Sequence, residues 1–386
     1  MTVNSTMRGR LNAAIYGAER SPIREFSRLA AQTPSCIRLT LGEPDFDTPE
    51  QICMAASEAF ENGETHYIEN NGLPELREEI ARFERYEKNL NYSPDEIIVT
   101  IGATEALFVA LFGILNPCDE VIVPIPGFVL YERIIGLCRG NFVPLDTRED
   151  GFQINAEKLS ALVTTRTKAI ILNSPNNPTG CIYNEESLSA VRDAVKGRGI
   201  FVICDDVYRG LCYSKYYHSF AEFHDMKEQT LVVQSFSKPY AMTGWRVGYL
   251  MADYAIKERL ELLHQFMVTS SPAPFQRACI SALSCDVAVE KMVSTYHKRR
   301  DYALERLNSM SLDVNKPEGA FYVFPSIAKF GINSNDFCTR LLLEDKLAVT
   351  PGFCFGADDY VRISYCCDDN VLSEGMNRLE RFISRL

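Results

Sequence analysis

The chain has 386 residues, and its 51 acidic side chains outnumber the 40 lysines and arginines to give a net charge of −11. A negative surface repels phosphate backbones and anionic lipid headgroups, so nucleic acid and membrane surfaces are poor partners. The composition, 46% hydrophobic and 24% charged, is typical of a globular enzyme. The length exceeds what one hydrophobic core supports, so we expect one large domain and one smaller domain.

The sequence contains no recognisable targeting or disulfide pattern. A polar start followed by Arg8 and Arg10 lacks the apolar core of a signal peptide, and the apolar run 106–115 is too short to cross a bilayer. The thirteen cysteines include no C-x-x-C pair, which favours reduced structural thiols over disulfides or a metal site. We therefore expect a cytoplasmic protein without a bound metal.

The first elements along the chain are an arm and a helix. Residues 1–20 are predicted to form a flexible arm. A helix is predicted to begin at Ser21 and Pro22, where serine is a favourable N-cap and proline suits the first turn. Ile23 and Phe26 then continue at helical spacing.

Between about residues 95 and 250, short apolar segments alternate with helical ones. Continuous apolar runs rich in β-branched residues are typical of strands that are buried on both faces. The predicted helices are 104–115, 127–138 and 185–197. The predicted strands are Ile97–Ile101, Val121–Pro124, Ala169–Leu172, Phe201–Cys204, Leu231–Gln234 and Val247–Met251. The alternation predicts an α/β domain with a mostly parallel sheet covered by helices.

After about residue 285 the pattern changes to that of an α+β lobe. A long charged helix over 287–309 precedes short strands at 320–324, 348–350 and 361–365 and a terminal helix. The N-terminal helix has no place in the repeated strand–helix unit, so we expect it to pack on this lobe. The predicted domains are 1–45, an arm and helix packed with the small domain; 46–285, the large α/β domain; and 286–386, the small domain.

Ligands of parallel sheets bind beyond the carboxyl ends of the strands, so the residues that follow each strand are candidate site residues. Gly102–Leu107 forms a small-residue turn and a helix start, which suits a phosphate but also an ordinary helix cap. Asn177 lies in a turn made rigid by two prolines and could offer its amide to a ring hydroxyl and a carboxylate; a plain turn is the alternative.

Asp205 and Lys238 follow the next two of these strands. Asp205 is either a turn former or a buried carboxylate that needs a cationic partner, such as a protonated pyridine nitrogen. Lys238 sits between hydroxyl residues after a buried strand, and a desolvated amine near other cations loses its proton easily and can form an imine. Ser235, Ser237 and Arg246 would then bind a dianion.

Taken together, these segments resemble the class I/II, fold-type-I aminotransferases that depend on pyridoxal 5'-phosphate. The resemblance covers about residues 15–385, with the motifs in family order. They are Gly42–Phe46, Tyr67 ahead of Gly72–Arg77, Gly102–Leu107, Asn176–Gly180, Asp205–Tyr208, Ser235–Lys238 through Arg246–Gly248, and Val361–Ser364. The stretches 21–26 and 314–322 resemble the bacterial aminotransferase A subgroup, which is linked to N-acetyl-diaminopimelate and aromatic amino acids; they indicate the subgroup more than the substrate. The resemblance implies a seven-stranded, mostly parallel sheet with a smaller α+β domain.

The resemblance also implies catalytic roles. Lys238 would form the internal aldimine with the cofactor and move the proton during a ping-pong exchange between an L-amino acid and a 2-oxo acid. Asp205 would keep the pyridine nitrogen protonated, and Tyr208 and Asn177 would bind the ring oxygen. Arg362 would clamp the substrate carboxylate. The other implied cofactor residues are Ala103, Thr104, Ser235, Ser237 and Arg246 for the phosphate, and Phe128 for the ring face, where many relatives have Trp or Tyr.

The family resemblance further implies a homodimer with shared sites, because Tyr67 would reach the phosphate of the partner's cofactor. The substrate pocket is predicted to contain Gly42, Ile23, Phe128, Tyr131 and the partner's Tyr67, which suits a bulky or partly apolar side chain. No second arginine for a distal carboxylate can be assigned, since Arg24, Arg277 and Lys316 are unplaced.

Two alternative functions share much of this pattern. A pyridoxal-phosphate β-lyase acting on C–S bonds uses the same lysine, aspartate and arginines, so these residues do not discriminate between the two reactions. A cofactor-binding transcription regulator would carry a basic helix-turn-helix domain ahead of the fold. Only about 20 residues precede the first predicted helix here, and the chain is acidic, which disfavours a regulator.

Overall fold

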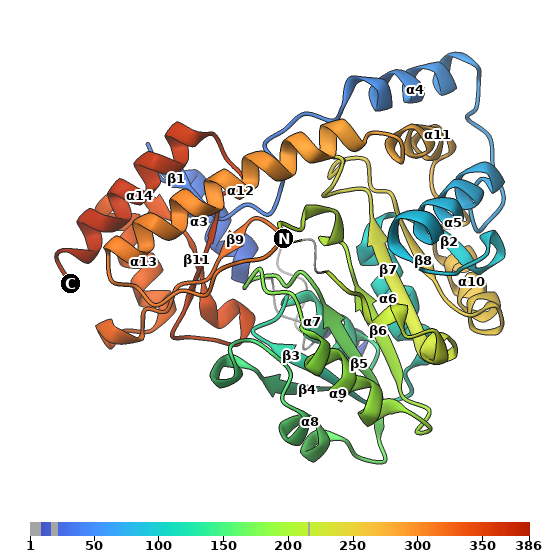
Figure 1. The fold of residues 1–386 in the computed structure, drawn as a ribbon, viewed down its shortest axis with the longest axis horizontal. Coiled ribbons are helices and arrows are strands. Elements are labelled where there is room, and N and C mark those ends of the chain that lie inside the picture. Colours follow the sequence, from blue (N-terminus) through green and yellow to red (C-terminus); the bar gives the residue numbers. More distant parts are fainter. Residues whose placement is uncertain (1–8, 17–21, 215–216) are drawn as a thin grey trace.

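The computed structural model describes residues 9–16, 22–214 and 217–386, arranged as a large sheet flanked by helices and a smaller lobe (Figure 1). Its helices are α2 (Ala13–Tyr16), α3 (Pro22–Gln32), α4 (Glu50–Glu61), α5 (Pro74–Lys88), α6 (Gly102–Ile114), α7 (Leu130–Leu137), α8 (Ala156–Leu162), α9 (Glu185–Val195), α10 (Tyr254–Val268), α11 (Ala273–Ala282), α12 (Asp286–Ser309), α13 (Ser334–Asp345) and α14 (Asp369–Ile383). The short helix α2 lies within the segment predicted as an arm. Most of that arm, and the predicted cap Ser21, lie outside the described residues.

The large sheet has seven strands in the order β2-β8-β7-β6-β5-β3-β4. All neighbours are parallel except β8, which is antiparallel to both β2 and β7. The strands are β2 (Ile97–Thr100), β3 (Glu120–Ile125), β4 (Asn141–Asp146), β5 (Thr167–Asn173), β6 (Phe201–Asp205), β7 (Thr230–Ser235) and β8 (Gly248–Met251). The predicted α/β class with a mostly parallel sheet is confirmed.

Helices cover both faces of this sheet because successive side chains of each strand point to opposite faces. On β5, Ile170 and Leu172 enter one hydrophobic cluster, whereas Ala169 and Ile171 enter the cluster on the other face. The same alternation holds for β2, where Ile98 faces away from its two neighbours. A strand buried on both faces must be apolar throughout, which is why the central strands could be predicted.

Strand β4 was missed by the sequence analysis. It forms the sheet edge, most of its residues are exposed or half-buried, and it contains Pro144. Proline is tolerated on an edge strand because one side of the backbone needs no partner there. The exposed edge removes the continuous apolar pattern that identified the other strands.

The small lobe contains two short sheets. β1 (Ile37–Arg38) pairs in parallel with β10 (Leu347–Ala348), and β12 (Val361–Ser364) lies between β11 (Thr350–Pro351) and β9 (Tyr322–Val323). Helix α3 contributes Phe26 and Ala30 to the core of this lobe, so the predicted packing of the N-terminal helix is confirmed. The predicted strand 320–324 is shorter, because Ala320 has a φ of 59° and turns the chain.

Helix α12 connects the two parts and runs obliquely across Figure 1 from α11 to the small lobe. The division at residues 45 and 285 stays a prediction. All thirteen cysteines are free, and eight of them are buried.

Candidate functional site

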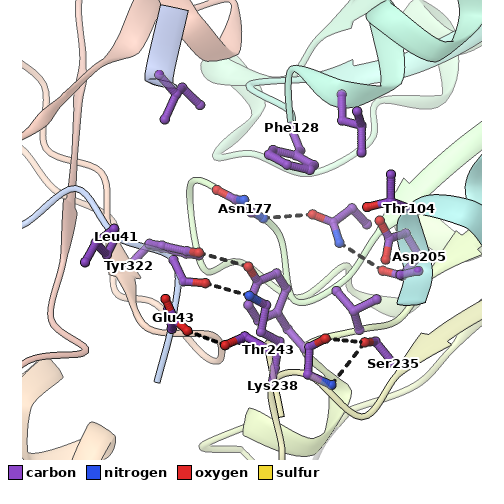
Figure 2. A pocket seen from close by; sticks show the side chains of 18 of the residues that line it. Leu41, Glu43, Thr104, Phe128, Asn177, Asp205, Ser235, Lys238, Thr243 and Tyr322 are labelled. Carbon is purple, nitrogen blue, oxygen red and sulfur yellow. Dashed lines mark hydrogen bonds between the residues drawn. The ribbon is translucent and has the colours of Figure 1, made fainter. Parts of the chain in front are cut away.

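A cavity of about 520 Å³ lies at the carboxyl end of the parallel strands. Strands β5, β6 and β7 end at it with Asn173, Asp205 and Ser235, and α6 begins beside it. The small lobe closes the opposite side with residues 40–43, Tyr322 and Arg362. Figure 2 shows Lys238 and Phe128 on opposite sides of the opening. The site therefore lies where the two lobes meet.

Lys238 is held in this cavity by a backbone contact. Its Nζ donates to the carbonyl oxygen of Gly42 at 2.5 Å. This bond joins Lys238, which follows β7 of the large sheet, to the chain segment that contains Gly42 and comes from the small lobe. Burial lowers the pKa of Lys238 to about 8, and the charges of Arg246 and Arg362 act in the same direction. An amine with such a pKa is partly neutral near pH 7 to 8, which a nucleophile requires.

Asp205 is buried below the cavity and has one unpaired oxygen. Its Oδ2 accepts a hydrogen bond from the Tyr131 hydroxyl at 2.6 Å, whereas Oδ1 has no partner. Burial raises the pKa of Asp205 to about 6, and the bond from Tyr131 opposes that shift. An unpaired buried carboxylate oxygen is costly, so this position suits a ligand with a cationic or N–H donor group. Tyr131 lines the cavity, as the sequence analysis predicted, and its hydroxyl in addition binds Asp205.

The start of α6 and the loop after β7 form a cradle for an anion. The first N–H groups of a helix lack partners within the helix, and the helix dipole favours negative charge there. Gly102 has a φ of +71°, and a Cβ at this position would collide with the Arg246 guanidinium. Ser237 lies beside it with its Oγ 2.9 Å from that of Ser235. Ala103 and Thr104 also line the cavity.

Arg362 approaches the cavity from β12 with its planar group held on several sides. Nη1 donates to Asn177 Oδ1 at 2.9 Å, Nη2 donates to the Thr40 carbonyl at 2.7 Å, and Nε has no partner. Its Cζ lies 4.4 Å from the centre of the Tyr322 ring. A fixed guanidinium of this kind is suited to two-pronged binding of a carboxylate.

Tyr208 and Tyr322 form a hydroxyl pair across the two lobes, with their oxygens 2.9 Å apart. Burial raises the pKa of Tyr208 well above its usual value and that of Tyr322 to about 12, so both are neutral phenols. The sequence analysis missed Tyr322 as a site residue, although it noted the stretch that contains it. Searching the strands of the small lobe for cavity residues, as was done for the large sheet, would have identified it.

The remaining predicted residues divide into those at the cavity and those away from it. Ile23, Gly42 and Phe128 line it, as do Glu43 and Thr243, which were not predicted. The structure therefore brings together every predicted site residue except Tyr67.

Tyr67 is 88% exposed and lies outside the cavity of its own chain. The residues left unplaced do not supply a further cation. Arg277 pairs with Glu64 and Glu75 elsewhere, and Lys316 is exposed. The side chain of Arg24 lies outside the described residues.

Two kinds of feature are absent from the residues that the structure describes. None of the helices among them is both long and apolar enough to cross a bilayer. Within the same part of the chain, no cluster of three or more His, Cys, Asp or Glu side chains could hold a metal ion.

Comparison with known proteins gives consistent results. Residues 34–379 match the family model for aminotransferase class I and II. A Bacillus subtilis (strain 168) protein named probable N-acetyl-LL-diaminopimelate aminotransferase is 40% identical over 97% of this chain and 95% of its own. An aspartate aminotransferase from Pyrococcus abyssi is also 40% identical, over 94% and 95% of the two chains. The crystal structure of an aromatic aminotransferase from Pyrococcus horikoshii superposes with a TM-score of 0.88 at 38% identity, covering 94% of this chain and 99% of that one.

Proposed function

The chain belongs to the class I and II aminotransferase family, and on this premise we propose which of its residues hold the cofactor, bind the substrate and complete the site. The protein is a transferase that depends on pyridoxal phosphate and moves an amino group between an amino acid and a 2-oxo acid. When bound, the cofactor supplies an aldehyde that condenses with amines and a ring that accepts electrons from the substrate Cα.

The observation that carries our assignment is a buried amine and an unpaired buried carboxylate oxygen at one cavity. We assign Lys238 Nζ as the group that binds the cofactor and then moves the proton at the substrate Cα. Asp205 Oδ1 would hold the protonated ring nitrogen, with Tyr131 fixing the other oxygen. Tyr208 and Asn177 would bind the ring oxygen, and Phe128 would cover the ring face.

The anion cradle would hold the phosphate through the backbone of Ala103, the hydroxyls of Thr104, Ser235 and Ser237, and Arg246. Arg362 would bind the substrate carboxylate, because Asn177, Thr40 and Tyr322 hold its guanidinium in one orientation. In these roles each of the two arginines at the described part of the cavity has one anionic partner, the phosphate for Arg246 and the substrate carboxylate for Arg362.

We further propose that the substrate carries a bulky, apolar side chain. The apolar side chains that line the cavity include Ile23, Leu41, Leu107, Phe128 and Leu130. The cationic side chains among the described lining residues are Lys238, Arg246 and Arg362, all of which have the roles above. Glu43 adds a negative charge at the same cavity, which disfavours a distal carboxylate on the substrate.

The chain is proposed to work as a homodimer in the cytoplasm. Tyr67 projects from the surface of its own subunit, so a second chain would receive it. Exposed apolar side chains on α10, Phe266 at 81% and Met267 at 41%, also favour burial against a partner. Thirteen free cysteines suit a reducing compartment. We also propose that residues 1–45 and 286–386 act as a small domain on the large domain 46–285.

One experiment tests the assignment of Lys238. Borohydride reduction of the holoenzyme, followed by peptide mapping, should label Lys238 and no other lysine. Lys238→Ala should fold normally, lose the visible band of the lysine-bound cofactor, and lose at least about 10³-fold in kcat, as expected for removal of a general acid–base group. Labelling of another lysine would contradict the assignment.

The substrate is tested by a half-reaction screen in which the purified holoenzyme meets single amino acids and the cofactor spectrum is followed. We expect aromatic and long apolar amino acids to convert the cofactor fastest. A strict preference for aspartate or glutamate would overturn the apolar pocket and leave the assignment of Lys238 intact.

A further inference from the structure

A buried histidine lies between the anion cradle and the segment that carries Tyr67. His264 on α10 is completely buried, and both of its ring nitrogens have partners. Nδ1 is 2.7 Å from Glu105 Oε1, and Nε2 is 2.8 Å from the carbonyl oxygen of Asn70. The ring therefore joins two segments that are far apart in the sequence.

The Glu105 end of this contact belongs to the cradle. Glu105 follows Ala103 and Thr104 in the first turn of α6, and its Oε2 accepts from the backbone N–H of Ile101. One carboxylate thus closes the turn that aims the free N–H groups of α6 at the cavity, and its other oxygen is fixed by His264. A substitution of His264 would therefore alter the position of the anion cradle through Glu105.

The Asn70 end belongs to the segment after Tyr67. The Asn70 side chain donates to the Thr269 carbonyl at the end of α10, and Arg77 binds Glu69 and the Gly72 carbonyl. These bonds fix the backbone at residues 69–72, which begin two residues after Tyr67, an aromatic side chain that is 88% exposed. Through its bonds to the Asn70 carbonyl and to Glu105, His264 connects this segment with α6, the helix that begins at the cavity.

The two contacts of the His264 ring need a hydrogen-bond donor on each side. The Asn70 carbonyl accepts only, and the Oε2 of Glu105 is already an acceptor for Ile101. A neutral imidazole donates from one nitrogen, so the Nε2 contact uses its proton and a further proton must lie in the contact between Nδ1 and Oε1. Apolar or shorter side chains at position 264 leave at least one buried acceptor unpaired.

We propose that His264 is a positioning residue that acts on two active sites of the dimer, on its own through Glu105 and on the partner's through Asn70 and Tyr67. This inference rests on the proposed function, in which Tyr67 crosses to the neighbouring subunit. It goes beyond that function because it assigns one buried side chain a role in cofactor affinity at both sites.

Hybrid dimers test the proposal. A chain with Lys238→Ala has no covalent cofactor of its own but still supplies its Tyr67, so a hybrid with an intact chain has one complete site. His264→Phe is placed either in the chain with Lys238 or in the chain with Lys238→Ala. The measured quantity is the dissociation constant of pyridoxal phosphate at the complete site, followed by the visible band during titration of the cofactor-free hybrid.

Both placements should weaken cofactor binding by about tenfold, because each removes a buried hydrogen bond that supports one side of the site. His224→Phe, a change at an exposed histidine away from the cavity, should leave the dissociation constant unchanged in either chain. An effect from the Lys238 chain alone, or from neither chain, would overturn the proposal.

Tyr67→Phe in the same two placements separates this inference from the proposed function. Tyr67→Phe should raise the dissociation constant of pyridoxal phosphate only when it is placed in the Lys238→Ala chain. If it does so while His264→Phe has no effect from that chain, the role of His264 fails and the shared site stands. If Tyr67→Phe acts only from the Lys238 chain, the shared site fails and the proposal for His264 falls with it.

The folded state needs an independent check, since His264 is buried. Hydrogen exchange of the Val99 and Gly72 amides, which bond to Asn71 and Glu69, should accelerate in His264→Phe, while amides of α12 stay protected. His264→Gln keeps an N–H donor and is the second variant in both placements. It should give the same pattern with a smaller loss, and a loss confined to one placement would again overturn the proposal.

Discussion

Two neighbouring carboxyl groups at the end of β6 have different partners, and the difference defines what each can do. Asp205 receives one hydrogen bond from Tyr131 and keeps a free oxygen at the cavity. Asp206 points the other way, accepting from Ser219 Oγ at 2.7 Å with the Arg209 guanidinium 4.0 Å away. Burial raises the pKa of both to about 6. Asp206 is hydrogen-bonded within the protein, whereas Asp205 Oδ1 has no partner.

A pH dependence of stability follows for the cofactor-free protein. The folded pKa of Asp205, about 6, exceeds its ordinary value of 3.8, so the folded state binds more protons between these pH values. Its contribution to stability is therefore full below about pH 4 and is lost as the pH rises through 6. The loss is on the order of 3 kcal/mol, from about two pKa units.

The measurement is urea unfolding of cofactor-free wild type and Asp205→Asn between pH 4 and 7. The unfolding free energy of wild type relative to the variant should fall by that amount over this range. A constant difference would mean that Asp205 is not desolvated in the folded chain.

Glu43 gives a second prediction at the scale of a single residue. It accepts a hydrogen bond from the Thr243 hydroxyl and lines the cavity, where its charge repels a substrate with a distal carboxylate. Glu43→Gln should raise kcat/KM for aspartate about fivefold, the effect of removing about 1 kcal/mol of repulsion in a solvent-exposed place, and leave phenylalanine unchanged. Steady-state kinetics with both amino acids measures this. Glu58→Gln on the exposed face of α4 is the control. An equal change of kcat/KM for both substrates in Glu43→Gln would refute the role of the Glu43 charge.

At the scale of elements, the site depends on how the strand β12 is fixed to the large sheet. Arg148 follows β4 and pairs with Asp146 at 2.7 Å and with Asp359 at 2.7 Å. Asp359 lies just before β12, the strand that presents Arg362. A single guanidinium thus ties the edge of the large sheet to the loop that positions the carboxylate-binding arginine.

Removal of the Arg148 ion pairs should increase the mobility of β12 without unfolding the small lobe. Arg148→Gln should cost about 1 kcal/mol, because the pair is partly exposed, and should raise KM for the amino acid several-fold more than it lowers kcat. Hydrogen exchange in residues 357–364 should accelerate. Arg82→Gln breaks an exposed pair with Glu79 on α5 and should change neither KM nor the hydrogen exchange of residues 357–364. An unchanged KM in Arg148→Gln would show that β12 is held by its strand partners alone.

At the scale of the whole molecule, exposed apolar side chains occur on both parts. On the large-sheet part they include Tyr67 and, on α10, Phe266 at 81% and Met267 at 41%. On the small lobe they include Leu343 at 58% and, on α14, Val371 at 38%. The proposed crossing of Tyr67 to the partner therefore selects the large-sheet side as the expected interface.

Association can be tested with one charge on each side. Phe266→Glu should shift the protein from dimer to monomer in sedimentation velocity and weaken cofactor binding in the same concentration range, because the monomer lacks the partner's Tyr67. Val371→Glu should leave the dimer intact. Full cofactor affinity in a monomeric Phe266→Glu would contradict the shared site.

The sequence by itself determined the parallel core and the order of the site motifs. Strands such as β5 and β6 are buried on both faces, so their apolar character is continuous and local, and Asn177, Asp205 and Lys238 follow strand ends that must meet at one sheet edge. Propensity and burial act over a few residues, which a linear pattern records.

Only the tertiary structure decided the contacts between residues far apart in the chain. The edge strand β4, the pairing of Tyr322 with Tyr208, the hydroxyl of Tyr131 at Asp205 and the contact of His264 with Glu105 all depend on packing between elements. A half-exposed edge carries little apolar pattern. A hydrogen bond across more than seventy residues is fixed by where the backbone brings the two groups, which no local sequence property encodes.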